Sequence, residues 1–263
     1  MEFLVQGKTV NAATGGYISS SECPAVILIH GAGMDRTAWQ LQTRNIAHRG
    51  IRVFAVDLPG HGRSDGPALE NIVDMTDWII QFMDTVKIKS ASLMGHSMGA
   101  LIALDAGARH SDRVDKVILV GVAETMQVHP ILLSAAAANK PLGPELIVFW
   151  GLGEAAKIGG HPSPGLWVHG ASKVLLGNAA LGVLSSDLEA CNAYRGIREA
   201  AAKIICPAYC VLGDQDKMTP VKSGRILSNS MADGHVVVIE NCGHMMMLER
   251  PHEFYYALKD VIF

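Results

Sequence analysis

A serine between two glycines has the surroundings that best suit covalent chemistry in this 263-residue chain. It lies at the centre of Gly95-His96-Ser97-Met98-Gly99, after the apolar residues 91–94 and before Leu101, Leu104 and Ala108, which are spaced as on a helix. This order predicts a strand, a tight turn and a helix, with the serine on the turn. Side chains at 95 and 99 would collide with the neighbouring strand and helix, which explains the glycines. The pattern therefore predicts a nucleophile that projects from the edge of a sheet.

A serine hydroxyl is a weak nucleophile at neutral pH, so it needs a base such as imidazole, which a carboxylate must orient. The chain supplies both groups after later strand-like segments. Asp214 and Asp216 follow residues 209–212, and His244 follows residues 236–239. Because parallel strands end at a common edge, these side chains are expected near Ser97. Residue spacing alone leaves both Asp214 and Asp216 open as the acid.

The elements that must position these residues are apolar strands that alternate with helical patterns. The sequence predicts a hairpin at residues 3–10, a helix with Trp78, Ile79, Phe82, Met83 and Val86 on one face, and a last helix that begins at Pro251. Further strands are predicted at 25–29, 52–56, 91–94, 116–120, 209–212 and 236–239. Such an alternation indicates the α/β class, with a mostly parallel sheet of about eight strands flanked by helices.

The alternation stops after about Gly121 and resumes near Ile204. The stretch between them is rich in Ala, Gly and Pro, and its helical pieces are predicted at 132–140, 145–151 and 184–194. We therefore expect an α/β core formed by residues 1–121 and 204–263, with residues 122–203 inserted as a helical lid.

Composition narrows the function further. A net charge of −3 gives no case for nucleic acid or an anionic membrane as partner, and the 49% of hydrophobic residues can fill a large core. No apolar run is long enough to span a membrane, and the first residues do not look like a signal peptide. Five irregularly spaced cysteines indicate free thiols and a cytoplasmic location. No dinucleotide, phosphate-loop or metal motif is present, so we expect no cofactor and no metal.

Four ordered motifs together resemble one family. They are His30-Gly31-Ala32-Gly33, the loop from Asp57 to Ser64, the acidic loop Gly213-Asp214-Gln215-Asp216 with Thr219-Pro220, and Gly243-His244 with Glu249 and Pro251. With the serine turn, they make the chain similar to the α/β-hydrolase superfamily, in its branch of lidded esterases, haloperoxidases and carbon–carbon hydrolases. The resemblance implies a triad of Ser97, Asp216 and His244. It also implies an oxyanion hole formed by the backbone N–H groups of Ala32 and Met98.

The nucleophile type selects among the activities of that family. Dehalogenases and epoxide hydrolases of this fold need an aspartate where this chain has Ser97. The resemblance therefore implies a carboxylesterase-like hydrolase that cleaves a small to medium uncharged ester through an acyl-enzyme on Ser97. The alternatives are a carbon–carbon bond hydrolase, a cofactor-free perhydrolase, and a slow-turnover small-molecule receptor on the same fold. We expect a monomer or a homodimer whose partner is a small-molecule ester.

Residues of the substrate pocket are harder to predict. Candidates for its lining are Met34, Phe149, Trp150, Trp167 and Met245, although packing of the lid onto the core explains the apolar lid residues equally well. His161 and His169 lie in the lid region, and for them contact with substrate is the less favoured alternative to an ordinary structural role. His96 is expected to brace the serine turn rather than to act as the base.

Overall fold

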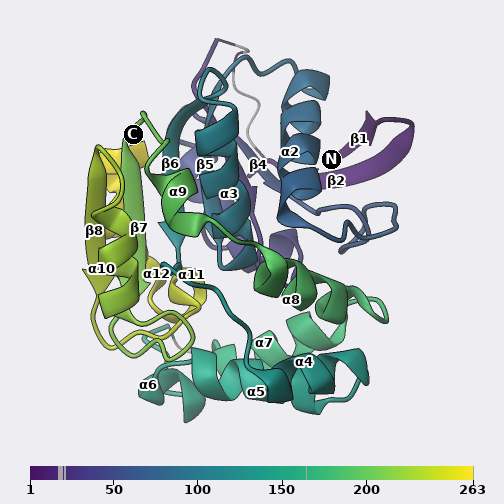
Figure 1. Cartoon of the computed structure of the whole chain (residues 1–263), viewed down its shortest axis with the longest axis vertical. Coiled ribbons are helices and arrows are strands. Elements are labelled where there is room, and N and C mark those ends of the chain that lie inside the picture. Colours follow the sequence, from purple (N-terminus) through teal and green to yellow (C-terminus); the bar gives the residue numbers. More distant parts are fainter. Residues whose placement is uncertain (17–19, 21, 164, 263) are drawn as a thin grey trace.

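The computed structural model describes residues 1–16, 20, 22–163 and 165–262. One sheet of eight strands runs through the molecule in the order β1-β2-β4-β3-β5-β6-β7-β8 (Figure 1). The strands are β1 (Glu2–Val5), β2 (Lys8–Ala13), β3 (Ala25–Ile29), β4 (Arg52–Val56), β5 (Ala91–His96), β6 (Val114–Val120), β7 (Ala208–Gly213) and β8 (Gly234–Ile239). β2 is antiparallel to both β1 and β4, and all other neighbours are parallel. The predicted fold class is confirmed.

The central strands are apolar on both faces because helices cover both sides of the sheet. All five side chains of β3 are buried, and they alternate between two cores. Ile27 and Ile29 pack in one core with α2 (Ile72–Thr85) and α3 (Met98–Arg109), whereas Val26 and Leu28 belong to the other. The second core also receives α1 (Thr43–Ala47) and α12 (Pro251–Ile262).

Between β6 and β7 the chain forms helices, and no strand occurs in the described residues 122–163 and 165–203. These helices are α4 (Pro130–Ala137), α5 (Leu142–Gly151), α6 (Glu154–Lys157), α7 (Val168–Gly177), α8 (Val183–Ala193) and α9 (Ile197–Ala201). We call residues 122–203 the insertion. Helices α4 to α8 gather at one end of the sheet, and α9 returns beside α3 (Figure 1).

Three of these helices correspond to predicted ones, with shifted bounds: α4, α5 and α8. The sequence did not predict α1, α6, α7 and α9, nor the short helices η1 (Arg36–Trp39), α10 (Val221–Ser228) and α11 (Met246–Glu249). Most of these have five residues or fewer, too few for a helical period to show.

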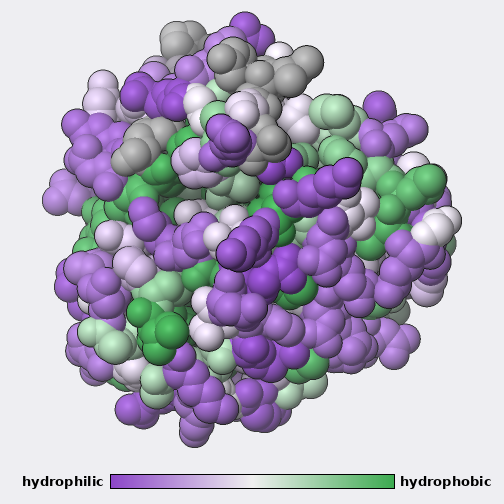
Figure 2. Space-filling view, turned by 90° about the horizontal axis from the view of Figure 1, so that it is seen from above, coloured by the Kyte–Doolittle hydropathy of each residue, from purple (hydrophilic) through white to green (hydrophobic). Residues whose placement is uncertain are grey.

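The distribution of hydrophobic residues on the surface is consistent with two cores inside the molecule. Seen from the end of the molecule away from the insertion, hydrophilic residues dominate, and hydrophobic ones form only small patches and recesses (Figure 2). In the part of the chain that the structure describes, no helix combines the length and the apolar character needed to cross a membrane.

Candidate active site

Ser97 occupies the turn between β5 and α3 in a strained backbone conformation, with φ +53° and ψ −110°. The two glycines of the motif make this turn possible. A Cβ atom on Gly95 would lie 1.8 Å from the carbonyl oxygen of Gly99, and one on Gly99 would lie 2.3 Å from that of Ile29. Both distances are shorter than any real contact, so no other residue fits either position without moving the backbone.

Asp216 and His244 meet at the ends of β7 and β8. His244 Nδ1 donates to Asp216 Oδ2 over 2.6 Å, and the Thr219 hydroxyl donates to the same oxygen over 2.5 Å. Asp216 Oδ1 accepts from the backbone N–H groups of Met218 and Thr219. Asp214 instead accepts from the N–H of Cys242 and so ties the two loops together. Of the two candidate acids, the structure brings Asp216 to the imidazole.

The electrostatics of the pair follow from its burial and its hydrogen bonds. Burial alone would lower the pKa of His244, but the charge and the hydrogen bond of Asp216 outweigh it and raise that pKa above its ordinary value. Burial would raise the pKa of Asp216, but His244 and Thr219 lower it instead. Asp216 is therefore a carboxylate at neutral pH, and it favours the protonated imidazole.

The second ring nitrogen of His244, Nε2, is the atom of this pair that is free to accept a proton. Nε2 is buried and has no hydrogen-bond partner among the described residues. His244 and Ser97 both line one cavity of about 430 Å³. Its apolar wall consists of Met126, Val128, Leu132, Trp150, Leu188 and Met218, and Gln127, His129 and Lys217 add polar groups. His244 and Ser97 thus line the same cavity, although no hydrogen bond joins Nε2 to the serine.

Backbone N–H groups lie beside the serine. Ala32 lines the cavity, and Met98 is the first residue of α3, where helical N–H groups have no partner within the helix. Neither N–H donates to another residue in the described ranges. Ala32 lines the cavity itself, whereas Met98 does not line it but directly follows Ser97.

His96 and Glu249 hold the loop of His244 in place. His96 Nε2 donates to the carbonyl oxygen of His244 over 3.0 Å, which links the serine turn to that loop. Burial, and then the neighbouring His244, lower the pKa of His96 to about 3, so it stays neutral. The expectation that His96 braces the turn agrees with this contact.

Glu249 is a buried carboxylate with three backbone partners. Oε2 accepts from Gly153 at 2.8 Å and Gly243 at 3.1 Å, and Oε1 accepts from Met245 at 3.0 Å. Burial raises the pKa of Glu249, and the three N–H groups counteract that rise. The side chain therefore joins the loop of His244 to the insertion, a role that its position in the sequence motif did not reveal.

Of the five predicted pocket residues, one lines the cavity and four do not. Trp150 lines the cavity, whereas Phe149 and Trp167 have 63% of their surface exposed and do not line it. Met34 and Met245 are buried outside the lining, and Met245 Sδ accepts from Ser172. The structure thus differs from the prediction at four of the five positions. For Phe149 the reason is that an apolar run does not say which face of a helix turns inward. Met34 and Met245 lie in loops beside the site, and their side chains pack in the core instead.

The two histidines of the insertion also lie elsewhere. His161 Nε2 bonds to the carbonyl oxygen of Leu248, and His169 Nδ1 to that of Lys157, and neither residue lines the cavity. His129, which was not among the predicted pocket residues, does line it. Its place before Pro130, where it caps α4, is the local signal that could have drawn attention to it.

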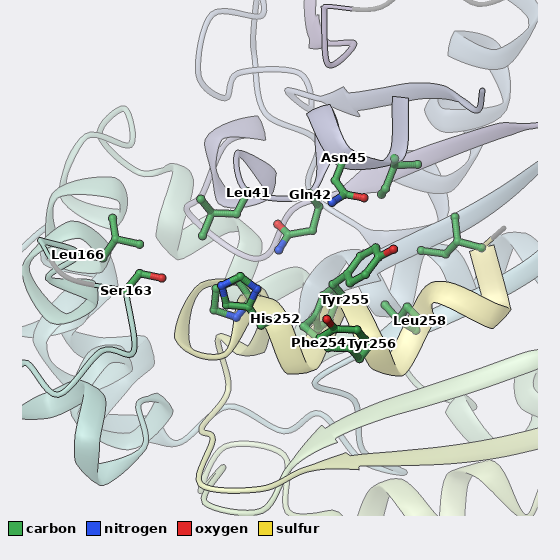
Figure 3. Close-up of a pocket in the computed structure, with 13 residues that line it drawn as sticks. Leu41, Gln42, Asn45, Ser163, Leu166, His252, Phe254, Tyr255, Tyr256 and Leu258 are labelled. Atoms are coloured by element: carbon green, nitrogen blue, oxygen red, sulfur yellow. The ribbon is translucent and has the colours of Figure 1, made fainter. Parts of the chain in front are cut away.

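A second hollow, of about 320 Å³, lies on another part of the molecule. Figure 3 shows Leu41, Gln42 and Asn45 facing side chains of α12, with Ser163 and Leu166 of the insertion at one end. None of the residues of the Ser97 cavity lines it.

Within the described ranges, no cluster of three His, Cys, Asp or Glu side chains has the arrangement needed to hold a metal ion.

Comparisons with known proteins find one matching family and several similar chains. Residues 26–258 match the model of the alpha/beta hydrolase family. The chain is 27% identical over 256 residues to the (E)-2-((N-methylformamido)methylene)succinate hydrolase of Acinetobacter baylyi, covering 95% of this chain and 94% of that protein. It is 31% identical over 257 residues to the pimeloyl-[acyl-carrier protein] methyl ester esterase of Chromobacterium violaceum, covering 90% and 93%.

A solved structure shares the fold over almost the whole chain. The enol-lactonase of Burkholderia xenovorans LB400 superposes with a TM-score of 0.86 at 23% identity, covering 99% of this chain and 98% of that one. At this level of identity the likeness concerns the fold.

Proposed function

Because the chain belongs to the alpha/beta hydrolase family, we propose that it is a serine hydrolase that cleaves small to medium uncharged carboxylic esters through an acyl-enzyme on Ser97. One observation carries the proposal. His244, whose Nδ1 is bound to a carboxylate and whose Nε2 has no partner among the described residues, lines the same cavity as a serine on a strained turn. Membership of the family supports hydrolysis as the reaction class, and the methyl ester esterase among its relatives supports an ester as the substrate.

In the first half of the proposed reaction, Ser97 Oγ attacks the ester carbonyl carbon while His244 Nε2 takes the hydroxyl proton. The N–H groups of Ala32 and Met98 donate to the oxygen on which negative charge develops. Asp216 stabilises the imidazolium that forms. When the tetrahedral intermediate collapses, the imidazolium gives its proton to the departing alkoxide, which leaves as an alcohol.

The second half repeats these steps with water. His244, neutral again, takes a proton from a water molecule that attacks the acyl carbon bound to Ser97 Oγ. Collapse breaks the bond to Oγ, the serine regains its proton from the imidazolium, and the carboxylic acid leaves. No redox partner or cofactor is needed for this cycle.

The cavity wall supports the substrate class. A volume of about 430 Å³ is within the range of pockets for small molecules, and most of the wall is apolar. Leu132, Trp150 and Leu188 come from the insertion, which in this proposal acts as a lid over the acyl group. A cytoplasmic location is part of the proposal and is in keeping with five free cysteines.

The decisive experiment replaces the nucleophile. Ser97→Ala should lower kcat for aryl esters by roughly 10⁶-fold, the scale found when a serine protease loses its nucleophile. Ser111→Ala, an exposed serine, is the matched control and should keep full activity. An aryl phosphonate ester should transfer its phosphonyl group to Ser97 Oγ in the wild type, with release of the phenol, and the variant should not gain that mass. Turnover that survives in Ser97→Ala would refute the assignment.

The same assay separates the alternatives. A series of esters of increasing acyl length should give rates that rise to an optimum and then fall as the cavity fills. Near-zero turnover, together with strong stabilisation by an unreactive ester analogue, would favour a receptor. Rapid cleavage of a diketone with slow cleavage of esters would favour a carbon–carbon hydrolase.

A further inference from the structure

A second buried histidine–carboxylate pair joins the insertion to the core. Asp187 of α8 is fully buried, and its Oδ2 lies 2.8 Å from His61 Nε2. The same oxygen accepts from the backbone N–H of Gly33 over 2.8 Å. Gly33 directly follows Ala32, whose N–H is assigned to the oxyanion hole. The insertion thus reaches the oxyanion loop, residues 30–34, through one carboxylate oxygen.

The hydrogen-bond partners of His61 determine its protonation. Nε2 faces the carboxylate of Asp187, and Nδ1 lies 3.0 Å from the carbonyl oxygen of Pro59. Both partners accept hydrogen bonds, so both ring nitrogens must donate, which only the imidazolium does. The neighbouring His30 differs: its Nδ1 faces the carbonyl oxygen of Gly31, but its Nε2 accepts from the N–H of Leu58. His30 is therefore neutral and His61 is charged.

The burial of Asp187 requires such a cation. A carboxylate removed from water is costly unless a positive charge and hydrogen bonds compensate it. Oδ1 has no hydrogen-bond partner among the described residues, so Oδ2 carries both of the contacts found. Burial alone would lower the pKa of His61, but the hydrogen bond and charge of Asp187 raise it above its ordinary value. The shift of the pKa and the hydrogen-bond geometry thus both indicate a protonated His61.

Helix α8 contacts the oxyanion loop at a second point, one turn earlier. A Cβ on Gly33 would lie 2.7 Å from Leu184 Cδ1, so the helix packs directly against the loop. On the following turns, Leu188 and Cys191 line the Ser97 cavity. One helix therefore touches the acyl cavity and the loop that must hold the oxyanion.

We propose that Asp187 and His61 form a buried ion pair that positions the Ala32 N–H for the oxyanion, which makes both of them positioning residues for the proposed hydrolysis. The inference rests on the proposed function for its catalytic consequence, but the ion pair and its effect on the loop are measurable without turnover. Loss of the proton from His61 leaves the Asp187 carboxylate buried without its counter-charge. The carboxylate then moves, and the loop that it holds through the Gly33 N–H shifts with it.

Other titratable groups face this pair. His30 lies beside His61 with 4.8 Å between the centroids of the tilted rings, and Asp57, which follows β4, also acts on His61 through its charge. Asp57 is held by the Arg36 guanidinium, and Cys191 lies near Asp187 on α8. His30 is neutral, Cys191 has its pKa raised by burial, and Asp57 is already paired. His61 is therefore the group whose ionisation is expected to control the contact above neutral pH.

The first test uses NMR on the full wild-type chain, with His61→Gln to assign the signal. Both ring nitrogens of His61 should be protonated at pH 7, above the ordinary histidine pKa of about 6.5. As the pH rises further and His61 loses its proton, the amide signals of Ala32 and Gly33 should move with the same midpoint. A neutral His61 at pH 7, or loop amides that ignore its titration, would overturn the proposal.

The second test measures kcat and KM on an aryl ester. Asp187→Ala should lower kcat by about 10- to 100-fold, the scale of a small misplacement in an active site, with KM nearly unchanged. Asp187→Asn should lose less, because its amide oxygen still accepts from Gly33. Glu189→Gln, an exposed isosteric change on the same helix, is the control and should match the wild type.

The pH profile distinguishes positioning from mere stability. The wild-type kcat should fall on the alkaline side as His61 deprotonates, and Asp187→Asn should lack that fall. Wild-type kcat and an unchanged alkaline profile in Asp187→Asn would refute the inference. A wild type with no ester hydrolysis would refute the proposed function instead, while the NMR titration would still decide the ion pair.

Discussion

Two buried histidine–carboxylate pairs in this molecule use the same side chains for different purposes. In both, a carboxylate accepts from the imidazole, and the pKa of the histidine is raised against the effect of burial. The difference is the other ring nitrogen. In His61 it donates to the carbonyl oxygen of Pro59, whereas in His244 it has no partner and its residue lines a cavity. The carbonyl oxygen of Pro59 thus keeps His61 as a structural cation, whereas the free nitrogen of His244 lets that residue act as a base in the proposed reaction.

The two pairs also differ in what their carboxylates hold. Asp216 accepts from two backbone N–H groups of its own loop and from Thr219, so its position is set locally. Asp187 accepts from Gly33, which is 154 residues away, so it links two parts of the chain. We therefore expect changes at Asp216 to affect chemistry most, and changes at Asp187 to affect geometry and stability.

The largest effect is expected from Asp216→Asn. The amide does not hold the imidazole in the required tautomer, and it does not stabilise the imidazolium, so kcat should fall by about 10⁴-fold, as in a serine protease triad. Asp214→Asn is the matched control, because Asp214 contacts the backbone of Cys242 rather than His244. If Asp214→Asn caused the larger loss, the acid would be misassigned.

The next effect is on the acid side of the pH profile. The raised pKa of His244 means that the free enzyme binds a proton there at a pH above the ordinary histidine value, and only the neutral form acts as a base. kcat/KM should thus fall about tenfold for each pH unit below that pKa. In Asp216→Asn the residual activity should keep its level to lower pH, because burial then lowers the pKa of His244 unopposed. A midpoint that stays in place would contradict the role given to Asp216.

A smaller effect concerns stability at the other pair. The pKa of His61 is raised by folding, so its ion pair stabilises the fold fully below the unfolded histidine pKa, and this contribution disappears as pH rises through the folded value. Asp187→Asn should lower the free energy of unfolding by about 3 kcal/mol at pH 6, the lower end for breaking a buried ion pair. The difference should shrink at pH 9.

Urea unfolding of both proteins at the two pH values measures this change. Asp105→Asn, which removes a buried carboxylate paired with Arg109, is the control. Arginine stays charged through this range, so the cost of Asp105→Asn should not shrink at pH 9. Equal costs of Asp187→Asn at both pH values would show that His61 does not supply the charge.

The contrast between the pairs also explains what the sequence could predict. Asp216 and His244 follow apolar strands, and parallel strands end at one edge, so local pattern and fold class were enough to predict their neighbourhood. Asp187 and His61 are 126 residues apart, and Asp187 lies on a helix without a motif. No local signal relates them, because their contact depends on how the insertion packs on the core.

The same limit applied to the wall of the cavity. Helix α5 carries five apolar residues in succession, Leu146 to Trp150, so the sequence gives no apolar stripe that would reveal the inward face. Phe149 and Trp150 were equivalent candidates for this reason. Successive residues of a helix point about 100° apart, and only Trp150 turns toward Ser97 and His244.

The smallest effect is expected from these two aromatic residues, and it tests whether Trp150 contacts the acyl group. Trp150→Ala enlarges the cavity and removes apolar contact with the acyl group, so KM for a medium-length ester should rise about 10-fold, on the scale of one or two lost methylene contacts. Phe149→Ala, one residue away and exposed, should leave KM unchanged. Equal effects would mean that Trp150 does not contact the acyl group.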